Sequence, residues 1–311
     1  MTVLCSICSS YSCKDAHAPT SSDGIEPEIK VASSGIIFQP SDDLKYDVSK
    51  YEKYTLPSKL VEISGLTIDA ERNELYAVND EKAILFKLSL DGEILEEVDF
   101  GKNADYEGLE KVDDAVYILK SNGKIVEYDT RTSKSIDTYD NPLSLSNDAE
   151  GLGYDHKTNS LLIACKGSPN IKSAPKLKKT KSVYSFNLDT KEFNNTPFIT
   201  VSDESLKRYL EENLSSKLSK KKRKKLLNRA ADFSPSAMAA HPDEDHFYIL
   251  SSAGKSLVVV DRKAVIKDIY FLDDSAYIQP EGICFDSESN MYISNEGKSL
   301  RSNIVKINYM K

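Results

Sequence analysis

A motif that recurs five times along this 311-residue chain constrains its fold more than any other feature. Each copy joins an apolar run, usually opened by Glu-Gly or Ser-Gly, to a second apolar run through a polar turn. Glu107 follows Ser64 by 43 residues, Glu150 follows Glu107 by 43, and Glu281 follows Ser236 by 45. Short strands that repeat at a constant period are typical of β-propeller blades. We therefore predict an all-β fold, a β-propeller.

The number of blades depends on the gap between the third and fourth copies. Glu150 and Ser236 are 86 residues apart, twice the period, so a six-bladed ring is also compatible with the spacing. Residues 203–229, however, begin with acidic residues, end with basic ones and repeat apolar residues at three- and four-residue steps, as amphipathic helices do. Five blades with a helical insertion near 203–229 are therefore favoured.

The two ends of the repeat region predict how the ring closes. The last copy ends at the chain terminus without an outermost strand, and residues 50–57 have strand character but no blade of their own. We expect this N-terminal strand to complete the last blade. The domain organisation is then a single propeller over residues 44–311, with the basic helical insertion inside it.

The N-terminal segment has a different composition. Residues 2–13 are small, apolar and uncharged, and a Ser/Thr/Pro/Asp-rich stretch without periodicity follows them. This arrangement is similar to the end of a bacterial lipoprotein signal peptide, with Cys13 as the acylated residue. We expect a lipoprotein-type leader and tether over residues 1–34 that attaches the protein to a membrane surface through a lipid anchor.

Composition narrows the chemistry of any site. Lys and Arg number 41 against 49 Asp and Glu, and this net charge of −8 argues against nucleic acid as a partner. The four histidines exclude most zinc sites and most His-driven catalysis. Residues 217–229 nevertheless carry eight positive charges. We interpret this run as a solvated helix end, with contact to anionic lipid headgroups as the alternative.

Propeller symmetry brings equivalent residues together. The inner strand of every blade starts at the same height, so Ser64, Glu107, Glu150, Ser236 and Glu281 are expected to form a ring at one mouth of the central channel. Three converging carboxylates would raise one another's pKa values or bind a cation, and calcium is a better candidate than magnesium. The alternative is structural: glycine permits close packing at the axis, and the glutamates bind neighbouring backbone amides.

A second polar set follows the second strand of each copy. It differs from blade to blade and is mixed in charge, so it could line a ligand-binding face. Polar turn residues at strand ends explain it equally well. The candidate residues are Asp80, Lys120, Lys166, Ser252 and Glu296.

Several ordered motifs in this chain resemble a known family. The phrases EISGLTIDAERNELYAVND, DYEGLE, NDAEGLGYD and QPEGICFDSESNMYISNEGK are similar to the SdiA-regulated family, the YjiK-like and CarP-like propellers, which has Bacteroidetes lipoprotein-like members. The resemblance covers roughly residues 44–309 and departs from the family pattern at Ser64 and Ser236, where Glu is absent. It implies a membrane-associated propeller of the bacterial cell envelope, linked in some members to calcium-regulated physiology.

Two classes of function follow from these patterns. The first is a non-catalytic envelope propeller, a periplasmic or outer-membrane lipoprotein, that binds calcium, a protein partner or a small-molecule ligand. The second is a metal-dependent esterase or phosphoesterase, similar to phytase-like propellers, in which the carboxylate ring holds the metal. We favour the binding function, because the sequence contains no repeated His, no nucleophile elbow and no dense Asp cluster, and we expect a monomer.

Overall fold

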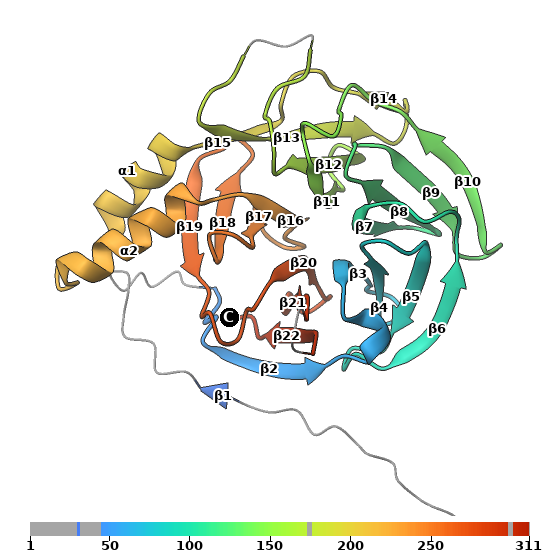
Figure 1. Cartoon of the computed structure of the whole chain (residues 1–311), viewed down its shortest axis with the longest axis horizontal. Helices are drawn as coiled ribbons and strands as arrows, with labels where there is room; N and C mark the ends of the chain where they lie inside the picture. The colour runs from blue at the N-terminus through green and yellow to red at the C-terminus, as the bar shows by residue number, and fades with distance from the viewer. Residues whose placement is uncertain (1–29, 32–44, 173–175, 298–300, 311) are drawn as a thin grey trace, which may run out of the picture.

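The computed structural model describes residues 30–31, 45–172, 176–297 and 301–310. Five antiparallel sheets stand around a common axis, and the strands of each sheet follow one another from the axis to the rim (Figure 1). The described residues therefore form a five-bladed β-propeller. The blade number predicted from the repeat is confirmed.

The blades are built from strands that are mostly consecutive in the chain. Blade 1 contains β3 (Ile63–Asp69), β4 (Glu74–Asn79), β5 (Ile84–Leu88) and β6 (Ile94–Asp99); blade 2 contains β7 (Tyr106–Val112), β8 (Ala115–Lys120), β9 (Ile125–Asp129) and β10 (Lys134–Tyr139); blade 3 contains β11 (Ala149–Asp155), β12 (Ser160–Cys165) and β13 (Thr180–Asn187), with β14 (Glu192–Phe193) and β15 (Ile199–Ser202) both paired to β13; blade 4 contains β16 (Pro235–Ala240), β17 (His246–Ser251), β18 (Ser256–Asp261) and β19 (Ile266–Phe271); blade 5 contains β20 (Pro280–Phe285), β21 (Met291–Asn295), β22 (Asn303–Ile307) and β2 (Lys50–Thr55).

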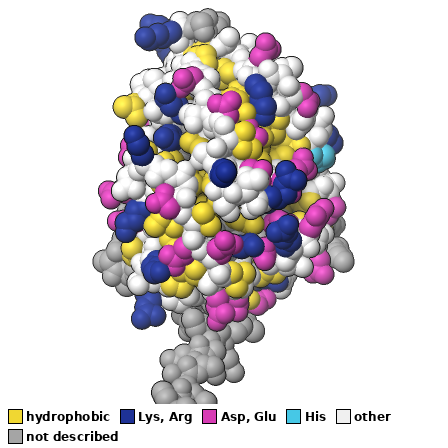
Figure 2. Space-filling view, turned by 90° about the vertical axis from the view of Figure 1, so that its right-hand side faces the viewer, with side chains coloured by type: hydrophobic (Ala, Val, Ile, Leu, Met, Phe, Trp, Pro, Cys, Tyr) yellow, Lys and Arg dark blue, Asp and Glu magenta, His cyan; other side chains and the backbone are white. Residues whose placement is uncertain are grey.

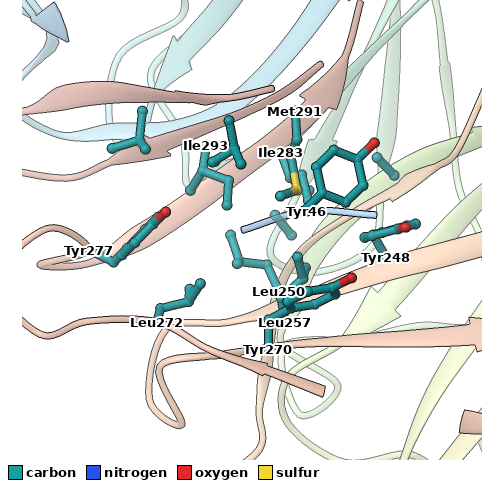
Figure 3. Close-up of a cluster of buried hydrophobic side chains, with 14 of the residues drawn as sticks. Tyr46, Tyr248, Leu250, Leu257, Tyr270, Leu272, Tyr277, Ile283, Met291 and Ile293 are labelled. Carbon is teal, nitrogen blue, oxygen red and sulfur yellow. The ribbon is translucent and has the colours of Figure 1, made fainter. Parts of the chain in front are cut away.

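Burial along the strands follows their distance from the axis. Every residue of β12 is buried, because neighbouring blades cover both faces of an inner strand. The outer strand β10 is exposed over most of its length. Figure 3 shows the interface between blades 4 and 5, where Leu250 and Leu257 share one apolar cluster with Ile283 and Ile293. Apolar contact between adjacent blades thus holds the ring together.

Blade 5 is completed by a strand from the opposite end of the sequence. β22 pairs antiparallel with β2, with Thr55 opposite Asn303 and Glu52 opposite Lys306. The prediction that residues 50–57 supply the closing strand is confirmed, although β2 itself ends at Thr55. The short strand β1 (Lys30–Val31) pairs with the other edge of β2, within the segment expected to be a tether.

A buried tyrosine secures the segment that leads into β2. Tyr46 forms a backbone bridge with Tyr309, and its hydroxyl donates a hydrogen bond to the Ser289 carbonyl at 2.6 Å. His241 Nε2 lies 2.8 Å from the same hydroxyl, while His241 Nδ1 accepts the backbone N–H of Glu244 at 3.0 Å. Because Nδ1 is an acceptor, the ring is neutral with its proton on Nε2. Burial accordingly lowers the pKa of His241.

Two helices make up the insertion between β15 and β16. The prediction of helix near 203–229 is confirmed, but α1 (Asp203–Asn213) and α2 (Lys220–Ala231) are separate. The break occurs because Leu214 is extended and Ser219 caps a new helix, its side chain accepting a backbone N–H of the first turn. The pair packs on the outside of blade 4 (Figure 1).

Candidate functional site at the axial mouth

A β-bulge interrupts the innermost strand of every blade at the same position. In β7, Tyr106 pairs with Lys120 and Gly108 with Leu119, so Glu107 has no partner across the ladder. The same register shift occurs in the other four inner strands. Bulges redirect the side chain of the extra residue. The bulged residues are the five predicted ring positions: Ser64, Glu107, Glu150, Ser236 and Glu281.

The channel beside this ring is almost filled. Its walls include the three ring glutamates and enclose a cavity of about 10 Å³, enough for about one water molecule. Glycine allows the inner strands to approach this closely. A Cβ on Gly108 would lie 2.8 Å from the Glu150 carbonyl oxygen, and one on Gly282 would lie 2.7 Å from the Leu66 backbone nitrogen. The recurrent glycine therefore packs the axis, whatever the adjacent glutamates bind.

The two serines of the ring contact the backbone of the next blade. Ser64 Oγ donates a hydrogen bond to the Tyr106 carbonyl at 2.5 Å, and Ser236 Oγ donates one to the Pro280 carbonyl at 2.8 Å. Tyr106 and Pro280 each precede a ring glutamate. The serine hydroxyls thus link blade 1 to blade 2 and blade 4 to blade 5. Because their protons are used in these hydrogen bonds, the two hydroxyls could act towards a ligand only as hydrogen-bond acceptors.

Lys166, which follows β12 directly, forms an ion pair with Glu150, and its charge also acts on Glu107 and Glu281. Burial raises the pKa of Glu107 and of Glu150 to about 8, and that of Glu281 to about 7. Repulsion adds to these shifts, since Glu150 acts on Glu107 and Glu281 acts on Glu150. Lys166 opposes all three shifts without cancelling them. Each of the three carboxyl groups is therefore harder to ionise than a glutamate in water.

Most of the predicted ligand face reaches this mouth. Lys120 does not, because its ammonium lies over the ring of Tyr106, 5.2 Å from the centroid. The pKa values of the ring glutamates respond to the other four residues: Asp80, Lys166, Ser252 and Glu296.

Sequence reasoning missed two further ionisable residues whose pKa values are shifted. Thr67 Oγ1 donates a hydrogen bond to Glu110 at 2.9 Å, and burial raises the pKa of Glu110 to about 8. Lys181 Nζ donates to the backbone carbonyl of Lys166, and burial lowers the pKa of Lys181. Alignment of the repeats would have singled out Glu110, because the equivalent residues carry no charge: Thr67, Gly153, Ala239 and Cys284.

The ring positions do not form a preassembled metal centre. Within the residues that the structure describes, no three His, Cys, Asp or Glu side chains are grouped closely enough to hold a metal ion. Oxygen donors suited to calcium are present, but an ammonium group already contacts Glu150. In the same part of the chain, no helix has the length and apolarity needed to cross a bilayer. Cys13, the predicted acylation site, lies outside the described residues.

Solved structures with a similar chain path have low sequence identity to this protein. Hydrazine synthase of Kuenenia stuttgartiensis is 10% identical with a TM-score of 0.47, over 80% of this chain and 83% of that one. A luciferin-regenerating enzyme is 12% identical with a TM-score of 0.46, over 82% of this chain and 92% of that one. Virginiamycin B lyase from Staphylococcus aureus is 13% identical with a TM-score of 0.43, over 88% of this chain and 80% of that one.

The family comparison is more specific. Residues 45–300 match the model of the SdiA-regulated family. This range contains all five ring positions and the helical insertion, and it agrees with the resemblance inferred from the repeated motifs. The chain is a five-bladed β-propeller that belongs to the SdiA-regulated family.

Proposed function

We propose that the protein is a non-catalytic, membrane-associated propeller of the bacterial cell envelope that binds a cation, calcium in the first place, at the axial mouth. The observation that carries this proposal is the excess of carboxylates over ammonium groups in the ring. Glu107, Glu150 and Glu281 have raised pKa values although Lys166 lies beside them. An additional cation would stabilise their ionised forms. The family resemblance and the predicted leader support the envelope location.

The donor chemistry fits a hard divalent cation, and Lys166 competes with it. Calcium prefers carboxylate oxygens, so Glu107, Glu150 and Glu281 would hold the ion, which would supply the charge that keeps them ionised. Among the described residues these carboxylates are not grouped closely enough to hold an ion as they stand, so Glu107 and Glu281 would have to turn towards Glu150 when it binds. The Lys166 side chain is 41% exposed, whereas that of Glu150 is 7% exposed. A long, half-exposed side chain can move its ammonium into solvent, while the buried carboxylate keeps its place. Loss of the ammonium should therefore strengthen cation binding.

Calorimetric titration of the full-length protein with calcium tests the proposal. We expect Lys166→Met to bind calcium about tenfold more tightly than wild type, and Glu150→Gln about tenfold more weakly, each a change of about 1.4 kcal/mol. Glu192→Gln, which neutralises an exposed glutamate of β14, is the matched control and should leave binding unchanged. Absence of calcium binding in both wild type and Lys166→Met would overturn the metal site. Metal-dependent hydrolysis of ester or phosphate substrates would overturn the non-catalytic assignment.

A further inference from the structure

The helix α2 has one face that packs against the protein and another that is covered with lysines. Leu226 and Ala230 are buried, and Arg223 donates hydrogen bonds to the carbonyls of Leu214 and Ser215 at the end of α1. On the outer face and in the turn before it lie exposed lysines. Within the described residues, their ammonium groups have no hydrogen-bond or ion-pair partner: Lys217, Lys220, Lys221, Lys222 and Lys224.

The position of these lysines is unfavourable for the helix itself. α1 has the usual arrangement, with Asp203 and Glu204 in the first turn, where negative charge stabilises the helix dipole. α2 has no acidic residue in its first turn and begins with lysines. Lys220 and Lys224 also repel each other across one turn. Local rules that are broken without compensation are typical of functional surfaces.

The placement of α2 indicates what this surface contacts. The helix pair lies outside the ring on blade 4, away from the axis where the acidic mouth is located (Figure 1). Figure 2 shows the side of the molecule opposite the helix pair, where basic and acidic side chains are intermixed. A flat anionic surface can therefore reach α2 without approaching the axial carboxylates. A nucleic acid would need a broader positive surface than a chain of net charge −8 provides.

We propose that α2 docks this side of the propeller on an anionic lipid surface, with its lysines bound to headgroup phosphates. The inference deepens the membrane association in the proposed function and does not depend on the axial cation site. Each lysine near such a surface raises partitioning about fivefold. The helix therefore acts as a membrane attachment site separate from any acyl chain.

Vesicle co-sedimentation tests this docking. The full chain carries Cys13→Ser, so that no acyl group contributes, and the buffer contains EDTA, so that calcium cannot bridge protein and lipid. We expect binding to phosphatidylcholine vesicles with about 30% phosphatidylglycerol at about 0.1 M salt, and weak binding to pure phosphatidylcholine. The triple variant Lys220→Gln/Lys221→Gln/Lys224→Gln should lower the partition coefficient about a hundredfold.

A matched variant controls for net charge. Lys82, Lys102 and Lys134 are exposed lysines of blades 1 and 2, and their replacement by Gln makes the same charge change and should preserve most of the binding. The α2 variant should unfold at the same or a higher temperature than wild type, because it loses like-charge repulsion. The proposal is overturned if the α2 variant still binds anionic vesicles like wild type, or if the control loses as much. The proposal is also overturned if the α2 variant loses affinity for a short DNA duplex but binds vesicles like wild type, because the lysines would then contact nucleic acid and not lipid.

Discussion

Replacement of Gly282 by alanine tests how tightly the propeller axis is packed. A Cβ at this position would lie 2.7 Å from both the Cβ and the backbone nitrogen of Leu66, and it would also meet Ser294 Oγ. Ordinary carbon contacts begin at 3.4 Å, so both contacts with Leu66 are too short by about 0.7 Å. Leu66 belongs to β3, the inner strand of blade 1. Relief of the overlap therefore requires blades 5 and 1 to separate.

The expected cost follows from this geometry. Overpacking of a filled core costs about 1–3 kcal/mol, and the lower unfolded-state entropy of alanine returns less than about 1 kcal/mol. A rigid backbone atom is involved, so we expect a net loss of about 2 kcal/mol in unfolding free energy. In a domain of this size, each kcal/mol lowers Tm by about 2–4 °C. Gly282→Ala should therefore melt about 4–8 °C below wild type.

Differential scanning calorimetry measures the effect, and Gly101→Ala is the control. No atom lies within 4 Å of a Cβ built on Gly101, so its replacement should change stability by less than about 0.5 kcal/mol. Equal melting temperatures for the two variants would refute the explanation that the recurrent glycines exist for axial packing.

Three further changes test the closure of the ring and its links. Deletion of residues 1–57 removes β2 and should abolish the cooperative unfolding transition, whereas deletion of residues 1–29 should preserve it; a cooperative transition in the longer deletion would contradict the role of β2. Because burial lowers the pKa of His241, this group should destabilise the fold as pH falls below about 6.5, whereas the axial glutamates with raised pKa values act in the opposite direction. Urea unfolding at pH 7.5 and 5.5 should therefore show that acidification is less unfavourable for His241→Gln than for wild type, and the same for the exposed His156→Gln as for wild type; an equal pH response in both variants would exclude a contribution from His241. Ser236→Ala should cost about 1 kcal/mol in urea unfolding, because the Pro280 carbonyl loses its donor, while the exposed Ser216→Ala should cost nothing measurable; equal midpoints would contradict the link between blades.

The blade number and the ring positions could be predicted because they depend only on repetition. Glu107 and Glu150 are equivalent by spacing, and a closed ring of similar blades must place equivalent residues together. The pairing of Lys166 with Glu150 could not be predicted, since several lysines stand at strand ends and side-chain packing decides which one turns to the axis. Lys120 shows the difference, because a neighbouring aromatic ring holds its ammonium instead.

Other features required three-dimensional context. The bulge at each ring position is a mismatch between two strands and is invisible in either strand alone. The division of the insertion into two helices depended on Ser219, one of several serines in the turn, becoming an N-cap. Glu110 could not be predicted from the repeated Glu-Gly motif, because a charged residue stands at this position in one blade only.

The pairing of β2 with β22 also affects how the chain folds during synthesis. β2 leaves the ribosome before any blade has formed, and its partner β22 is the last of the described strands to be synthesised. Until β22 is made, the edge of β2 that it will cover is unpaired and could pair wrongly with another chain. Contacts between such distant segments also slow folding, because a large loop must close before they are made. Synthesis must therefore extend past β22 before the ring can close, and a chain that is released after an interruption within blade 5 would have first and last blades that cannot join.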